Sequence, residues 1–335
     1  MAETVNREAT VGASLDAITG ELSRTGKTTS TLNLVVWIDD PNRRDWILER
    51  AGRLASKHPS FTLILDHTGE RRGDATVSAQ GRDDQAQATA QGERVDIDVA
   101  GLNTATIESY VNALCAAGVP TVLWWSGARV ESRPIFEALL PHAEMLLVDS
   151  SGALRDQSGI SRLVEFHRTH RDVVLRDLAW LRIGPWQDMI AGFFDDPALR
   201  QELFSIRRLY VVSGSASEAL YLGGWLARGL GWTATGHEHL TDRNGKPVTL
   251  VREQEGEIRR IQRICLDSES SWYHAEVTAD PGVVKVWSEG ENARESRLFP
   301  LRAIDNTSLL ERAILEPGTD ELFEQTLRTL ETLLE

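Results

Sequence analysis

The sequence predicts an α/β protein, with a mainly parallel βαβ N-terminal domain followed by an α+β domain that contains an antiparallel meander. Over the first 150 residues, short apolar runs alternate with amphipathic stretches, which is the rhythm of βαβ units in a parallel sheet. Further on, strand-like runs are separated by Glu255-Gly256 and Asp280-Pro281-Gly282, and such residues form the tight turns of antiparallel hairpins. A chain of 335 residues with 41% apolar residues is long enough for two such domains.

The first domain, residues 1–150, is predicted to hold an N-terminal helix and the βαβ sheet. Val11, Leu15, Ile18 and Leu22 recur at helical spacing and predict an amphipathic helix over about 9–24. The run 32–38 is almost continuously apolar, which is typical of a strand covered on both faces. The other predicted strands are 61–65, 75–78, 95–99, 121–125 and 145–148, and the other predicted helices are 41–56, 103–117 and 133–140.

Residues 151–205 are predicted to be a helical connection, with two or three helical pieces over 158–195 and a break near Gly184-Pro185. The second domain, residues 206–335, then begins with a strand and a helix, because an apolar run is followed by an apolar-periodic stretch that opens with serines. Its predicted strands are 206–212, 248–254, 257–266, 272–278 and 283–287, the last four forming the meander, and its predicted helices are 215–230, 308–315 and 319–334.

The charge balance argues against nucleic acid and membrane partners. The formal net charge is −14 and no run of basic residues occurs, whereas binding to a phosphate backbone needs a concentrated basic surface. No apolar run approaches membrane-spanning length, and the first residues lack the pattern of a signal peptide. We therefore expect a cytoplasmic protein.

No arrangement of residues in the sequence predicts catalysis, a cofactor or a metal. A G-x-S-x-G motif does not occur, and Cys115 and Cys265 lie in apolar segments that would not lower a thiol pKa. His237 and His239 could share one face of a strand, but a zinc site needs three or four ligands. Surface histidines are the favoured interpretation, and we expect no enzyme activity.

Ser213, Gly214 and Ser215 are a candidate anion-binding turn, because they lie between a predicted strand and a predicted helix. The full glycine pattern of a nucleotide site is missing. Serines in this place also cap a helix by accepting hydrogen bonds from its free N–H groups. Helix capping is the favoured interpretation of this turn.

Basic residues are concentrated in the predicted meander of this acidic protein. They are Arg252, Arg259, Arg260, Arg263 and Lys285. Because successive side chains in a strand alternate between faces, only part of this set can line one surface. Contact with an acidic partner or a phosphate and cross-strand pairing with neighbouring glutamates are equally good explanations; under the first, Arg259, Arg260 and Arg263 are partner-binding candidates.

Tryptophan is unusually frequent, with 10 residues against 8 phenylalanines and 4 tyrosines. Tryptophan buries a large area and is enriched at the centres of protein–protein interfaces. Core packing explains most of these residues, but Trp124 and Trp125 are adjacent in a predicted strand and must face opposite ways. One of them could line a site at the carboxyl edge of the sheet, so both are partner-binding candidates.

Three tryptophan-containing blocks carry a resemblance to a known family. They are VLWWSG at 122–127, DLAWLRIGPW at 177–186 and GWLARGLGW at 224–232. In order and spacing they resemble the glucose-6-phosphate dehydrogenase assembly protein family, OpcA. The resemblance implies a non-catalytic protein that binds glucose-6-phosphate dehydrogenase, promotes its oligomeric assembly and activates it in the oxidative pentose phosphate pathway.

The densest of these blocks supplies four more partner-binding candidates, Asp177, Trp180, Arg182 and Trp186. A local pair between Asp177 and Arg182 that holds a break between helices is an equally good explanation of the block. The alternative function is a sugar-phosphate or nucleotide-binding α/β protein that uses the turn from Ser213 to Ser217.

Overall fold

The computed structural model describes most of the chain. The described ranges are 4–12, 14–25, 30–69, 74–82, 89–127, 133–153, 157–197, 199–235, 239–255, 260–301, 306–316 and 318–334. The chain divides into two compact units, each built from more than one segment. Unit 1 comprises Met1–Val148, Arg171–Arg176 and Asn306–Pro317, and unit 2 comprises Asp149–His170, Asp177–Asp305 and Gly318–Glu335.

Unit 1 is built around a mixed sheet. Its elements are β1 (Thr4–Gly12), α1 (Leu15–Thr25), β2 (Asn33–Ile38), α2 (Pro41–Lys57), β3 (Ser60–Asp66), β4 (Asp74–Arg82), β5 (Thr89–Asp98), α3 (Thr104–Leu114), β6 (Thr121–Trp125), α4 (Pro134–Leu139), a 3-10 turn (Leu140–His142), β7 (Met145–Val148), β8 (Val174–Asp177, its last residue in unit 2) and α10 (Asn306–Leu315). Within the described residues, the strand order is β1-β4-β5-β3-β2-β6-β7-β8. The pairs from β5 through β7 are parallel, and β4 is antiparallel to both of its neighbours, β1 and β5.

The parallel centre of this sheet is the predicted βαβ region. Every residue of β2, β3 and β6 is buried, as expected for strands with both faces covered. The helix α2 begins where predicted, because Asp40 accepts a hydrogen bond from the Asn42 N–H and Pro41 occupies the first helical position. Its apolar side, with Ile47, Ala51 and Leu54, is buried.

The N-terminal helix is shorter than predicted. The helix α1 begins at Leu15, and residues 4–12 form β1, which pairs antiparallel with β4 so that Val11 lies opposite Ala75. The predicted helix over about 9–24 is therefore wrong for its first turn. A few apolar residues at helical spacing cannot distinguish a helix from a strand end, and the pairing with β4 supplies hydrogen bonds that local periodicity does not reveal.

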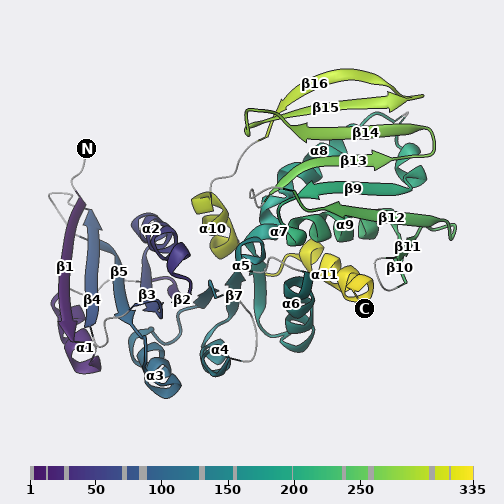
Figure 1. Ribbon diagram of the computed structural model, residues 1–335. Coiled ribbons are helices and arrows are strands. Elements are labelled where there is room, and N and C mark those ends of the chain that lie inside the picture. The colour runs from purple at the N-terminus through teal and green to yellow at the C-terminus, as the bar shows by residue number, and fades with distance from the viewer. Residues whose placement is uncertain are drawn as a thin grey trace. The chain divides into compact units, whose positions relative to one another are not determined.

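Unit 2 combines helices with a second sheet. Its elements are α5 (Ser150–Ala153), α6 (Gln157–Thr169), α7 (Leu178–Arg182), α8 (Gly184–Phe193), a 3-10 turn (Glu202–Ser205), β9 (Arg208–Ser213), α9 (Ala216–Leu230), β10 (Thr233–Ala234), β11 (His239–Thr241), β12 (Pro247–Glu253), β13 (Ile261–Asp267), β14 (Ser271–Val277), β15 (Val283–Gly290), β16 (Arg294–Pro300) and α11 (Glu321–Leu334). Within the described residues, the strand order is β10-β11-β12-β9-β13-β14-β15-β16. In Figure 1 these strands are green to yellow-green, with α9 and α11 on one side of them.

The antiparallel meander is present, but it begins one strand later than predicted. The strands β13, β14, β15 and β16 pair in succession and antiparallel. The strand β12 instead runs parallel to β9, which separates it from β13. A parallel neighbour needs a crossover, and α9 lies in the connection from β9 to β12.

The segment 151–205, predicted to be a helical connection, also contains a strand, β8 (Val174–Asp177). Four residues are too few for periodicity to separate a strand from a helix. The predicted break near Gly184-Pro185 is confirmed, because α7 ends at Arg182 and α8 begins at Gly184.

Two glycines allow α9 to lie close to its neighbours. A Cβ atom on Gly223 would lie 2.8 Å from Leu250 on β12, and one on Gly224 would lie 3.0 Å from Leu330 on α11. The helix therefore packs between the second sheet and α11 at a distance that larger residues would not permit. None of the helices in the described ranges is long and apolar enough to span a bilayer.

Candidate functional site

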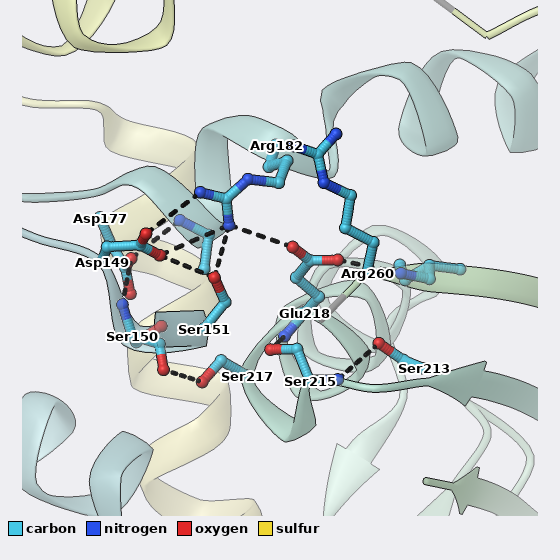
Figure 2. Close-up of polar contacts among 12 residues, drawn as sticks. Asp149, Ser150, Ser151, Asp177, Arg182, Ser213, Ser215, Ser217, Glu218 and Arg260 are labelled. Atoms are coloured by element: carbon cyan, nitrogen blue, oxygen red, sulfur yellow. Dashed lines mark hydrogen bonds and ion pairs between the residues drawn. The ribbon is translucent and has the colours of Figure 1, made fainter. Parts of the chain in front are cut away.

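A buried arginine in unit 2 holds several acidic and hydroxyl groups together (Figure 2). Arg182 on α7 donates hydrogen bonds to Ser151 Oγ at 2.6 Å, to Glu218 Oε1 at 3.2 Å and to Asp149 Oδ1 at 3.4 Å. Only 8% of the Arg182 and Asp149 side chains and 2% of the Glu218 side chain are exposed. We call Asp149, Ser151, Arg182 and Glu218 the arginine cluster. Removing either partner of a pair buried to this degree is costly.

Glu218 links the first turn of α9 to the start of β13. Its Oε2 accepts a hydrogen bond of 3.0 Å from the backbone N–H of Ile261, while Oε1 faces Arg182. Burial raises the pKa of Glu218 from 4.5 to about 7, and the charge of Arg182 opposes that rise. Burial by itself would lower the pKa of Arg182, but the nearby charges of Asp149 and Glu218 outweigh it and raise that pKa.

Asp177 forms a second buried centre beside the arginine cluster. Its Oδ1 accepts hydrogen bonds from the N–H groups of Ala179 at 2.9 Å and Ser150 at 3.1 Å, and its Oδ2 accepts one from the Tyr221 hydroxyl at 2.7 Å. Asp177 is thus the N-cap of α7 and ties α7 to α5 and α9. Burial raises the pKa of Asp177, and the hydrogen bonds from Ser150 and Tyr221 oppose the rise.

These contacts correct one prediction for the densest tryptophan block. Arg182 forms its ion pairs with Asp149 and Glu218 and not with Asp177. Sequence reasoning missed Asp149 and Glu218, although a signal existed. Asp149 directly follows a predicted apolar strand, and Glu218 lies in the first turn of a predicted helix. An acidic group buried at either place needs a cation to compensate its charge.

The serine turn between β9 and α9 is used within the fold. Ser215 is the N-cap of α9, and its Oγ accepts from the Glu218 N–H at 3.4 Å. Ser213 Oγ accepts from the Ser215 N–H at 3.1 Å, and the Gly214 N–H donates to the Arg260 carbonyl at 3.3 Å. The capping interpretation is confirmed. The carboxylate of Glu218, which lies in the first turn of α9, faces Arg182 and the Ile261 N–H. Anion binding at the serine turn stays a prediction.

The tryptophans predicted as partner contacts are buried. Trp124, Trp125, Trp180 and Trp186 are 0%, 1%, 5% and 4% exposed. The Trp180 indole donates a 2.8 Å hydrogen bond to Asp320. These side chains stabilise the fold from within and offer almost no surface to another protein.

Two of the indoles lie at the point where the first sheet reverses its strand order. The strand β2 has β3 on one side and β6 on the other, both parallel to it, and nucleotide crevices of α/β proteins open outside such a point. Here Trp37 on β2 stacks on Trp125 on β6, with ring centroids 5.4 Å apart and planes at 6°. The helix α2, which follows β2, is capped by Asp40, whose side chain accepts a hydrogen bond from the Asn42 N–H. Its first residue is Pro41, which has no N–H group. A pyrophosphate would meet a carboxylate there instead of a glycine-rich turn.

One face of the second sheet is polar and aromatic. The opposite face packs on α9, because Leu250 meets Gly223 and has Leu209 of β9 as its register partner. Residues that alternate with these on β9 and β12 to β16 share the other face, which we call the open face. By register the open face includes Tyr210, Glu253, Arg263, Trp272, His274, Lys285, Trp287, Glu289 and Leu298.

Of the predicted basic contacts, Arg263 lies on this open face and its guanidinium is 5.6 Å from the ring centroid of Tyr210. Arg260 precedes β13 and is partly exposed. Arg259 and His237 lie outside the described residues. Within the described ranges, no three histidine, cysteine, aspartate or glutamate side chains gather as a metal site requires. The basic contacts stay predictions.

Comparisons with known proteins agree with the two-part architecture. A family model described as the glucose-6-phosphate dehydrogenase subunit N-terminal domain matches residues 51–165, and one described as its C-terminal domain matches residues 173–327. An OxPP cycle protein OpcA of Synechocystis sp. is 28% identical over 135 residues, which are 40% of this chain and 28% of that protein. An OxPP cycle protein OpcA of Nostoc punctiforme is 31% identical over 134 residues, or 39% of this chain and 28% of that protein. The matches thus span under a third of the length of these relatives.

Solved structures resemble the chain more distantly. The UDP-N-acetylglucosamine 3-dehydrogenase GnnA from Acidithiobacillus ferrooxidans is 11% identical, with a TM-score of 0.42 over 91% of this chain and 96% of that one. The aldose-aldose oxidoreductase from Caulobacter crescentus is 9% identical, with a TM-score of 0.45 over 90% of this chain and 96% of that one. A likeness at this level carries no conclusion about activity. The two family models, matched in order along the chain, together with the named relatives, show that the chain belongs to the OpcA family of glucose-6-phosphate dehydrogenase assembly proteins.

Proposed function

We propose that this protein is a non-catalytic assembly factor and allosteric activator of glucose-6-phosphate dehydrogenase in the oxidative pentose phosphate pathway. One observation carries the proposal. Both family models that match the chain are described as domains of a glucose-6-phosphate dehydrogenase subunit, and they follow one another in order over residues 51–165 and 173–327.

The geometry supports a role without catalysis. In the arginine cluster, Asp149 accepts hydrogen bonds from Arg182 and from the Ser151 hydroxyl, and Glu218 accepts them from Arg182 and from the Ile261 N–H. Where the first sheet reverses, Trp37 and Trp125 stack on each other and Asp40 caps its own helix. Side chains that are committed to packing and capping are poorly placed for a cofactor or for proton transfer.

The mechanism follows from differential binding. A protein that binds the active oligomer of the dehydrogenase more tightly than its inactive forms shifts the population toward the active oligomer. The shift can be no larger than the difference in affinity between the two forms. A net charge of −14 suits a protein partner better than nucleic acid, and we place this function in the cytoplasm.

The test combines kinetics with hydrodynamics. Initial rates of NADPH formation by the dehydrogenase of the same organism are measured with and without this chain, and the mixture is examined by sedimentation velocity. We expect a heavier complex and a change in kcat or KM, which an unrelated acidic protein of similar size does not cause. An unchanged sedimentation profile together with unchanged rates would refute the proposal, and so would NADPH formation by this chain alone.

A further inference from the structure

We propose that the open face of the second sheet is the surface that docks on the dehydrogenase, with Trp272 and Trp287 as its main aromatic contacts. This inference rests on the proposed function and adds to it the contact surface and its chemistry. The surface lies in the part of the chain that matches the C-terminal family model, residues 173–327.

Strand register places the aromatic residues of this face side by side. His274 on β14 has Trp287 on β15 as its register partner, and their rings stack with centroids 4.7 Å apart and planes at 12°. Trp272 lies two residues before His274, so it points to the same face. Burial alternates along β14, since Ser271, Tyr273 and Ala275 are buried while Trp272 is exposed. The alternation shows that these aromatic rings face away from the core of the unit.

Large apolar side chains on this face are exposed to solvent. Trp272 is 43% exposed and Leu298 on β16 is 68% exposed. Trp272 shares this face with Trp287, which lies two residues before Glu289, the register partner of Trp272. Large apolar groups that share one face of a sheet mark a site of protein contact when they lie together. Tryptophan is also one of the three residue types enriched among side chains that dominate binding energy.

Neighbouring side chains hold the aromatic rings in place. Lys285 Nζ lies 5.0 Å from the ring centroid of Trp287, and the Trp287 indole donates a 3.0 Å hydrogen bond to Glu289. On strands β9, β12 and β13 of the same face, the Tyr210 hydroxyl donates to Glu253 while the Arg263 guanidinium lies over the Tyr210 ring. Side chains that are already ordered lose less entropy on binding, so this face is prepared for contact.

Charge distinguishes this face from the rest of the chain and argues for a partner other than a second copy. The face carries Arg208, Arg263 and Lys285 against Glu253, Asp267, Glu276 and Glu289, so it is nearly neutral in a chain of net charge −14. Two copies of this chain would each bring that acidic charge and repel one another. A nearly neutral aromatic face is the place where a different protein can approach most easily.

The size of the face is adequate for a stable complex. Six strands at a spacing of about 4.8 Å, each about seven residues long at roughly 3.3 Å per residue, give a flat footprint of about 650 Å². Specific interfaces bury about 800 Å² of accessible surface on each partner, and side chains add relief to a flat footprint. The open face can therefore supply most of one side of such an interface.

The test compares face variants with a matched control in the full-length chain. The Trp272→Ala/Trp287→Ala double variant should bind the dehydrogenase at least tenfold more weakly by interferometry or calorimetry, because two aromatic contacts are removed. The Leu298→Glu variant should have a similar effect, since it adds a charge to the face while its side chain contributes little to packing. The control is Leu322→Ala on α11, whose leucine is 43% exposed and lies outside the open face; its affinity should stay within about twofold of the unaltered chain.

The outcomes separate this inference from the proposed function. If the unaltered chain does not bind the dehydrogenase, the proposed function fails. If it binds and both face variants bind equally well, the docking surface is elsewhere. If the unaltered chain dimerises by sedimentation and the face variants are monomers with full affinity for the dehydrogenase, a second copy is the occupant and the inference is overturned.

Discussion

The hydroxyl of Tyr221 on α9 donates a 2.7 Å hydrogen bond to Oδ2 of Asp177, the residue that caps α7. Both side chains are buried, and the Tyr221 ring also lies edge-on to Trp180, with centroids 5.9 Å apart. The pair therefore fixes the start of α7 against the middle of α9. Arg182, which holds the arginine cluster, lies on the same short helix.

We expect Tyr221→Phe to lower the free energy of unfolding by about 1.5–3 kcal/mol, because it removes a hydrogen bond to a buried acidic group. Asp177→Ala should cost more, since it leaves the Ser150 and Ala179 N–H groups and the Tyr221 hydroxyl without their acceptor. Urea unfolding of both single variants and the double variant measures the coupling. Strictly additive effects would contradict a direct interaction between the two side chains.

Arg182→Met is predicted to lower the free energy of unfolding by about 3–5 kcal/mol, because it leaves Asp149 and Glu218 buried without their cation. The matched control is Arg168→Met on α6, where the arginine side chain is 51% exposed and pairs with Glu165. An exposed pair of this kind contributes no more than about 1 kcal/mol. Equal losses for the two variants, measured by denaturant titration, would show that the arginine cluster is not a stabilising centre.

Stability should depend on pH through Glu218, whose carboxyl has its pKa raised from 4.5 to about 7 mainly by burial. Between these values the folded protein holds a proton that the unfolded chain has released. The free energy of unfolding should therefore fall as the pH rises from about 4.5 to about 7, by as much as about 3 kcal/mol from this group. Asp177, whose pKa is also raised by burial, contributes with the same sign.

The Glu218→Gln variant isolates that contribution, because glutamine keeps the shape and an acceptor for Ile261 but does not titrate. Its stability relative to the unaltered protein should improve between pH 5 and pH 8 in urea titrations. Glu165→Gln, at an exposed carboxylate, should keep a pH profile parallel to that of the unaltered protein. A parallel profile for Glu218→Gln as well would mean that Glu218 is charged throughout.

Substituting a buried tryptophan should lower the stability of the fold, whereas substituting an exposed tryptophan should weaken binding to the dehydrogenase. Trp125→Ala removes a ring that is 1% exposed and stacks on Trp37, so it should lower the free energy of unfolding by about 3–5 kcal/mol. At a temperature where that variant is still folded, its affinity for the dehydrogenase should be unchanged. Trp272→Ala should do the reverse, with nearly native unfolding and weaker binding. The two measurements are denaturant unfolding and titration calorimetry.

Much of the fold was predictable because many of its elements depend on patterns of residues that are close together in the sequence. The strand Asn33–Ile38, the helix Pro41–Lys57 and the break between Arg182 and Gly184 all follow from apolar runs, capping residues and a proline. The errors arose where pairing partners decide the structure. The segment Thr4–Gly12 is a strand because it pairs with β4. The strand β12 is not part of the meander because β9 lies between it and β13.

The candidate site residues also divide into those whose role depends on near neighbours in the sequence and those whose role depends on distant contacts. The tryptophan blocks and the serine cap of α9 were visible in the sequence, because their meaning depends on residue type and near neighbours. The pairing of Arg182 with Asp149 and Glu218 could not be assigned from the sequence, since these residues lie 33 and 36 residues away in the chain and no local pattern connects them. Burial of Trp124 and Trp125 and exposure of Trp272 were equally hidden, because a strand's alternation does not say which of its faces a helix will cover.

The amino-acid sequence by itself determined the fold class, the order of most helices and strands, and the resemblance to the OpcA family, because each of these depends on contacts or patterns that are short along the chain. Only the tertiary structure decided which acidic groups surround Arg182 and which aromatic rings of the second sheet reach its surface. Those outcomes depend on strand register and on the packing of α9, which bring together residues that no local pattern connects.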